Sequence, residues 1–135
     1  MIELLIGVAL LQTGDPCHAV PQGQTARSCP LWRSAFRNAR FEIFANPASV
    51  VRTGGTFEIS LRIVYAADVV RRTRSAVARH RYDCAARTSV MLHITTYDAA
   101  GAVVEDRDAL SDENAPLPAP PGSPSAVQLA AYCPR

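Results

Sequence analysis

The clearest pattern in the chain is an alternation of apolar and polar side chains between residues 56 and 66. Successive side chains of a β-strand point to opposite faces, so a period of two predicts a strand with one buried face. The apolar positions, which we expect in the core, are Phe57, Ile59, Leu61, Ile63 and Tyr65. The polar positions between them are Glu58, Ser60 and Arg62.

Weaker alternation predicts further strands, and Gly, Asn and Pro mark the turns between them. The strands are expected at residues 40–44, 75–84, 88–98 and 102–108, with a short extended piece at 50–52. The turns are expected at residues 46–49, 53–55, 85–87 and 99–101. Residues 109–123 contain Pro116, Pro118, Pro120 and Pro121, so we expect a loop that is too rich in proline to join a β-ladder.

A helix is expected after this loop. Ser123 suits the N-cap and Pro124 suits the first helical position, and the helix runs to about Cys133. The face predicted from the helical spacing consists of Ala126, Leu129, Ala130 and Cys133. Together these elements predict an α+β fold, in which a twisted antiparallel sheet of five to six strands carries one C-terminal helix on one face.

Four cysteines allow three pairings. Cys84 ends a predicted strand, and the predicted helix directs Cys133 toward the sheet, so a Cys84–Cys133 disulfide would tether the helix. Cys17 and Cys29 can form a second, smaller loop if both remain in the mature protein. A disulfide indicates an oxidising compartment.

The first residues have features of an export signal. The apolar run Leu4–Leu11 is too short to span a bilayer but suits the apolar region of a signal peptide. Small residues allow cleavage after Ala19, so we expect a signal peptide at residues 1–19 and no transmembrane segment in the mature chain. Glu3 is unusual in such a signal, and the alternative is a buried first strand of a cytosolic protein.

A chain of 135 residues has room for one domain. Residues 20–38 have no clear periodicity, and we expect a polar leader that Trp32 and Phe36 anchor. The domain itself is expected at residues 39–135.

The positive charge of the chain comes entirely from arginine, since all 14 basic residues are of this type. The absence of lysine excludes a Schiff-base lysine and a P-loop lysine. Five arginines form a candidate patch for an acidic protein or glycan ligand: Arg71, Arg72, Arg74, Arg79 and Arg81. The alternative is a solvated strand face, balanced by the acidic residues of 105–113. We expect Arg79 and Arg81 opposite the core, in solvent beside His93.

The chain has no catalytic or cofactor-binding motif. A G-x-S-x-G elbow and a Gly-rich phosphate loop are missing, and no aromatic residues are interleaved for nucleic-acid binding. The register that best collects apolar residues pairs Cys84 with Thr88, Tyr82 with Val90, His80 with Leu92 and Ala78 with Ile94. It places His80 and His93 on opposite faces, so no metal site is predicted. An enzyme would need a concave pocket that collects His80, Tyr82 and a carboxylate.

Several short motifs together resemble a known family. They are the segment 46–54 (NPASVVRTG), Tyr82-Asp83-Cys84, the hairpin 96–101 (TYDAAG), the segment 120–123 (PPGS) and the terminal Cys133. In this order and spacing, residues 40–133 resemble the surface-adhesin protein E family of small Gram-negative envelope proteins.

The resemblance implies an antiparallel sheet with a C-terminal helix tethered by Cys84 and Cys133. It also implies location in the periplasm or at the cell surface, since the family's named member is surface-exposed and binds extracellular-matrix proteins of the host. We therefore expect an exported, non-enzymatic, adhesin-like binding module. The alternatives are a periplasmic structural or accessory domain without a host ligand, and a small enzyme.

Overall fold

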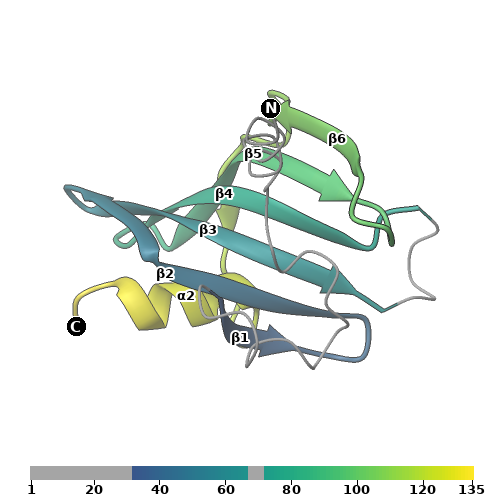
Figure 1. Cartoon of the computed structure of the whole chain (residues 1–135). Helices are drawn as coiled ribbons and strands as arrows, with labels where there is room; N and C mark the ends of the chain where they lie inside the picture. The colour runs from purple at the N-terminus through teal and green to yellow at the C-terminus, as the bar shows by residue number, and fades with distance from the viewer. Residues whose placement is uncertain (1–31, 67–71) are drawn as a thin grey trace, which may run out of the picture.

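The computed structural model describes residues 32–66 and 72–135. In these residues a single antiparallel sheet follows chain order from β1 to β6, and one helix covers part of one face (Figure 1). The elements are β1 (Arg33–Arg37), β2 (Phe41–Thr53), β3 (Thr56–Tyr65), β4 (Ser75–Asp83), β5 (Thr88–Tyr97), β6 (Val103–Asp108), β7 (Leu117–Pro118) and α2 (Pro124–Tyr132). The predicted α+β class, the strand count and the C-terminal helix are confirmed.

The sheet is a meander because tight turns join consecutive strands. Gly54 (φ +61°) lies in the turn between β2 and β3, and Gly101 (φ +90°) lies in the turn between β5 and β6. Side chains rarely tolerate these angles, which is why the turn positions read from the sequence carry glycine. Arg87 adopts φ +57° in the turn between β4 and β5.

The face that α2 covers, here called the helix face, holds the main core. Of the predicted apolar positions of β3, Phe57, Ile59 and Leu61 are buried in this core with residues of β2, β4 and α2, and Ile63 packs against it. Tyr65 is half-buried and packs against Phe41 instead. The fully buried members are Ile43, Ala45, Phe57, Ile59, Leu61, Tyr82 and Leu129. On the opposite side, here called the far face, Trp32, Phe44 and Val64 form a second buried cluster. The far face also buries Arg62, a position that the alternation identified only as polar.

Helix α2 begins as predicted but presents a different face to the sheet. The Ser123 Oγ accepts a hydrogen bond from the Ala126 N–H at 3.2 Å, and Pro124 is the first helical residue. Gln128 and Leu129 are its buried residues, whereas Ala130 is exposed. The prediction that Ala130 faces the sheet was therefore wrong. The helix is rotated so that the Tyr132 ring packs on Phe57, with ring centroids 5.5 Å apart.

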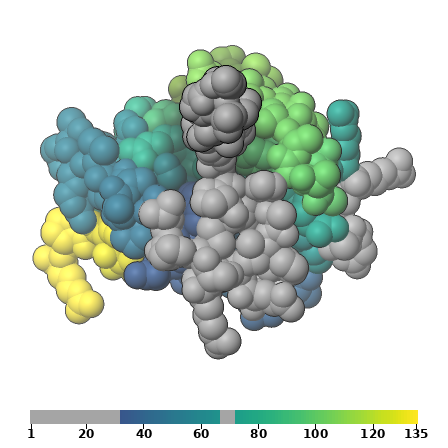
Figure 2. Space-filling model, viewed as in Figure 1, coloured from purple at the N-terminus to yellow at the C-terminus, as the bar shows by residue number. Residues whose placement is uncertain are grey.

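The predicted disulfide is confirmed. Cys84 and Cys133 are bonded, with their Cα atoms 5.7 Å apart, and they lie 49 positions apart in sequence. Arg52 holds the same end of the helix, since its Nη1 donates to the Tyr132 carbonyl at 2.7 Å. Figure 2 shows the C-terminal segment (yellow) against the early strands (blue), at the opposite edge from the segment that contains β6 (green).

Two elements differ from the expectations. β1 lies inside residues 20–38, which were expected to be a leader without periodicity, and it pairs antiparallel with β2. Residues 117–118 form β7 on Thr88 and Ser89 of β5, although the proline-rich loop was not expected to join a ladder. A two-residue edge strand needs few N–H donors, and the Ala119 N–H supplies one to the Arg87 carbonyl at 3.2 Å.

The expected turn at residues 46–49 is an irregularity within one continuous strand. β2 runs from Phe41 to Thr53, and its register against β3 shifts between Asn46 and Val51. The Asn46 side chain accepts from the Ala48 N–H at 3.1 Å, and the Ser49 hydroxyl donates to the Asn46 carbonyl at 2.6 Å. These hydrogen bonds are typical of a turn, but strand β2 continues past them.

The register expected between β4 and β5 was wrong at three of its four pairs. The structure pairs Asp83 with Thr88, Tyr82 with Ser89 and His80 with Met91, and only the expected pair of Ala78 with Ile94 is present. A bulge between Arg79 and His80 leaves Leu92 as an extra residue in β5. Because Leu92 shifts the register by one residue, the expected pair of Ala78 with Ile94 is present beyond the bulge.

Some expectations concern residues outside the described part of the chain. These are the signal peptide at 1–19, most of the leader at 20–38, the fate of Cys17 and Cys29, and the position of Arg71.

Candidate binding site

The far face of β3, β4 and β5 carries rows of mostly polar side chains that the antiparallel register places side by side. Thr56, Asp83 and Thr88 form the first row, at the hairpin ends of the strands. The second row is Glu58, Arg81 and Val90, and the third is Ser60, Arg79 and His93. Directly opposite residues of an antiparallel pair share a face, so each row is a continuous strip across the sheet.

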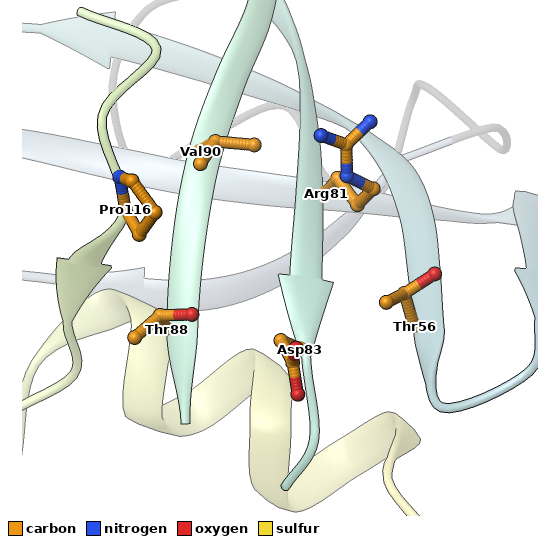
Figure 3. Close-up of a pocket in the computed structure, with 6 residues that line it drawn as sticks. All are labelled: Thr56, Arg81, Asp83, Thr88, Val90 and Pro116. Atoms are coloured by element: carbon orange, nitrogen blue, oxygen red, sulfur yellow. The ribbon is translucent and has the colours of Figure 1, made fainter. Parts of the chain in front are cut away.

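The first two rows, apart from Glu58, line a hollow of about 150 Å³. Its lining residues are Thr56, Arg81, Asp83, Thr88, Val90 and Pro116. Figure 3 shows Asp83 beside Thr88 on neighbouring strands and Arg81 further along β4, with the helix behind the sheet. We call this hollow the Arg81 pocket.

Pro116 reaches the rim of the Arg81 pocket because an ion pair organises the loop before it. The Arg107 guanidinium donates to both carboxylate oxygens of Glu113, at 2.6 and 2.9 Å. One of these oxygens also accepts from the Leu110 N–H at 2.8 Å. The Arg107 guanidinium lowers the pKa of Glu113 to about 2, so the ion pair persists at acidic pH.

Several polar groups of the Arg81 pocket remain available to a ligand. Within the described residues, the Arg81 guanidinium and the Thr88 hydroxyl have no hydrogen-bond or ion-pair partner. One oxygen of Asp83, Oδ1, accepts from the Ala86 N–H at 2.9 Å, and Oδ2 has no such contact within this range. The Thr56 hydroxyl donates to the Thr53 carbonyl at 2.9 Å and keeps its capacity to accept.

The guanidinium of Arg79 is occupied by contacts within the protein, contrary to the expectation that Arg79 lies in solvent. Its Nη1 donates to the Ser49 carbonyl at 2.8 Å and to the Ser60 hydroxyl at 3.1 Å, and its Nε is 3.4 Å from Glu58. The side chain is only 25% exposed. Arg79 therefore fastens the irregular part of β2 to β4. Its predicted position beside His93 is confirmed.

The structure does not gather the other arginines of the candidate patch around Arg81. Arg72 and Arg74 precede β4, at the opposite end of that strand from the Arg81 pocket. The Arg74 N–H donates to the Tyr97 carbonyl at 2.8 Å, which holds this segment against β5. Among the described members of the patch, Arg81 alone lines the pocket.

His93 lies between two carboxylates on the exposed part of the far face. Its Nδ1 is 2.8 Å from Asp108 and its Nε2 is 2.6 Å from Asp106. The hydrogen bonds to Asp108 and Asp106 raise the pKa of His93. The Thr95 hydroxyl and His93 in turn lower the pKa of Asp106. Because each ring nitrogen faces a different carboxylate, the group suits a protonated imidazole, and no metal-binding cluster is found among the described residues.

His80 and Tyr82, the residues that an enzyme would need in a pocket, lie on the helix face. Their rings are stacked with centroids 6.1 Å apart, and the His80 Nδ1 is enclosed with no hydrogen-bond partner among the residues that the structure describes. Burial lowers the pKa of His80 to about 4. Burial also raises the pKa of Tyr82 to about 12, against the smaller opposing effect of its hydrogen bond with Ser125. The hydrogen-bond partner of Tyr82 is thus Ser125 of α2.

The largely enclosed His80 predicts a loss of stability in acid. Its pKa is about 4 in the folded protein and about 6.5 when unfolded, so between these values the unfolded chain binds more protons. Above pH 6.5 His80 is neutral in both states and does not lower the free energy of unfolding. As the pH falls toward 4, its protonation in the unfolded chain lowers the free energy of unfolding by about 2–3 kcal/mol. Urea unfolding of the wild type and of His80→Gln, from pH 4.5 to 7, should show a flatter pH dependence in the variant. His93→Gln is the comparison on the exposed face, and it should not flatten the pH dependence, because the pKa of His93 is raised and not lowered. Equal slopes for wild type and His80→Gln would contradict this role.

The sequence indicated Arg81 but none of the other residues of the Arg81 pocket. Thr56, Thr88 and Val90 join it through strand register, and Val90 was expected on the core face with Tyr82. The correct register would have placed Val90 beside Arg81. Pro116 comes from a loop whose path no local pattern indicates.

The fold and the site define a class: a meander sheet whose helix is tethered by a disulfide and whose far face carries a small polar pocket. A family model, surface-adhesin protein E, matches residues 32–134. The chain belongs to the surface-adhesin protein E family, as its motifs indicated. No curated protein and no solved structure gives a significant match. In the described part of the chain, no helix has the length and apolar character needed to cross a membrane.

Proposed function

We propose that this protein is an exported, non-enzymatic binding module of the cell envelope, and that its ligand-contacting surface is the far face around the Arg81 pocket. The observation that carries this proposal is the match to the surface-adhesin family, which spans nearly all of the described residues. The family description concerns adhesion at a surface, and adhesion requires an exposed surface with available polar groups.

Two features of the structure support the proposal. The Cys84–Cys133 disulfide suits an oxidising compartment such as the periplasm or the cell surface. The Arg81 pocket offers a guanidinium that has no partner in the described part of the chain and lies on a rigid sheet, and arginine is enriched at protein interfaces. Arg79, by contrast, serves the fold, so Arg81 replaces the wider arginine patch as the proposed centre of binding.

Surface labelling of intact cells tests the proposed location. A membrane-impermeant reagent that modifies carboxylates, such as those of the exposed Asp106 and Asp108, should label the protein in intact cells. A known periplasmic protein serves as the control that must stay unlabelled. Labelling only after the outer membrane is permeabilised would favour the alternative, a periplasmic accessory domain without a host ligand, over an adhesin.

A further inference from the structure

We propose that the Arg81 pocket binds one sugar residue of an acidic glycan, a sugar that carries a carboxylate or a sulfate. This inference rests on the proposed function as a binding module, and it names the ligand class of that site. It follows from the mixture of groups in the pocket, which includes a cation and acceptors that no other described residue occupies.

The cationic side of the Arg81 pocket selects for an anion. Arg81 is exposed, and within the described residues its guanidinium has no ion-pair or hydrogen-bond partner. A guanidinium presents several N–H donors in one plane, which suits the two or three oxygens of a carboxylate or sulfate. Glu58, its cross-strand neighbour, lies within salt-bridge distance of Arg79 instead, so Arg81 is left for a ligand.

The opposite side of the Arg81 pocket selects for hydroxyl groups. The Asp83 Oδ2 can only accept a hydrogen bond, and the Thr56 hydroxyl already donates to the Thr53 carbonyl and so can only accept another. Two acceptors side by side need a ligand with donors. A sugar ring carries hydroxyls beside its acidic group, whereas a glutamate or aspartate side chain ends in acceptors alone. An acidic peptide side chain would satisfy Arg81 and leave Asp83 facing a second carboxylate.

The dimensions and the apolar wall agree with one sugar residue. The hollow of about 150 Å³ is smaller than the roughly 300–1,000 Å³ that encloses a drug-sized ligand. Val90 and Pro116 form one side of it, and this wall can pack against the C–H groups of a ring. The pocket lies on strands of a rigid sheet, so it is largely formed before the ligand arrives.

Four probes separate the ligand classes in titrations of isotope-labelled protein, purified from cells that express the full chain. They are a heparin tetrasaccharide, a hyaluronan tetrasaccharide, maltotetraose and a tetraglutamate peptide. We expect the backbone amide signals of Thr56, Asp83, Thr88 and Val90 to shift with at least one acidic saccharide and not with maltotetraose. Hyaluronan distinguishes a carboxylate ligand from heparin, which also carries sulfate.

Matched variants test the two sides of the Arg81 pocket. Arg81→Gln should weaken binding of the acidic saccharide by roughly tenfold or more, because a charge-assisted hydrogen bond is lost. Arg37→Gln, at an exposed position of β1 outside the pocket, removes the same charge and should change the affinity little. Asp83→Asn removes an acceptor and should weaken saccharide binding, although it makes the pocket more positive.

Three results would overturn the proposal. They are the absence of shifts with both acidic saccharides, tighter saccharide binding by Asp83→Asn, and pocket shifts with tetraglutamate at equal or higher affinity. The last result would assign the pocket to an acidic protein segment. None of these outcomes bears on export, which the labelling of intact cells decides separately.

Discussion

Replacing Cys133 with alanine should lower the free energy of unfolding by about 3–4 kcal/mol. The disulfide joins residues 49 positions apart, so it removes much of the freedom that the unfolded chain would otherwise gain. Its two ends also lie on different layers, since Cys84 follows β4 and Cys133 follows α2. Without the bond, a nine-residue helix must stay on the sheet through packing alone.

Urea unfolding under oxidising conditions measures this loss. Cys84→Ala should match Cys133→Ala, and the double variant should be no less stable than either single variant, because each change removes the same bond. Reduction of the wild type should give a similar loss. A double variant that loses the sum of the two single effects would show that the cysteines act independently, contrary to the disulfide.

The sequence predicted the parts of the fold that local chemistry determines. The alternation of β3 identified the core face, glycine marked the turns at Gly54 and Gly101, and Ser123-Pro124 marked the start of the helix. Each signal is contained within a few residues, so it can be read without knowledge of the partner strand. The fold class followed from these signals.

The predictions from the sequence were wrong where an element depends on a partner that is distant along the chain. β1 has little alternation of its own, and it exists because β2 offers it a free edge. The β4–β5 register depends on one bulged residue, Leu92, whose carbonyl accepts from the Ala109 N–H at 3.0 Å. The rotation of α2 depends on Tyr132 packing over Phe57.

The candidate site was predictable only in part for the same reason. Arg81 stood out by its charge, but apart from Asp83 its neighbours in the Arg81 pocket come from two other strands and a loop. Arg79 looked equivalent to Arg81 because the two are on one face of one strand. Its different role depends on the irregular path of β2, which brings the Ser49 carbonyl to within 2.8 Å of it.

Leu129→Ala should lower the free energy of unfolding by about 2–4 kcal/mol. Leu129 is 1% exposed and belongs to the core cluster with Ile43, Leu61 and Tyr82. Truncation removes buried methyl groups and leaves a cavity between the helix and the sheet. Leu110→Ala is the matched control, since Leu110 is 58% exposed and the same deletion there should cost little. Equal losses at both positions would contradict the docking of the helix through Leu129.

Combining Leu129→Ala with Cys133→Ala tests whether the disulfide and the packing hold one and the same helix. If the helix stays docked without its tether, the two losses should add, because each variant then removes a separate contribution. If the untethered helix already leaves the sheet, Leu129 is solvated before it is truncated and its substitution costs less in that background.

We expect the second result, in which the substitution of Leu129 costs less without the tether. The helix has nine residues and only two buried side chains, Gln128 and Leu129, and the Gln128 amide is enclosed without a hydrogen-bond partner within the described residues. Burying that amide costs free energy that offsets part of what Leu129 and Tyr132 contribute by packing on the sheet, so the tether and the packing should prove strongly coupled.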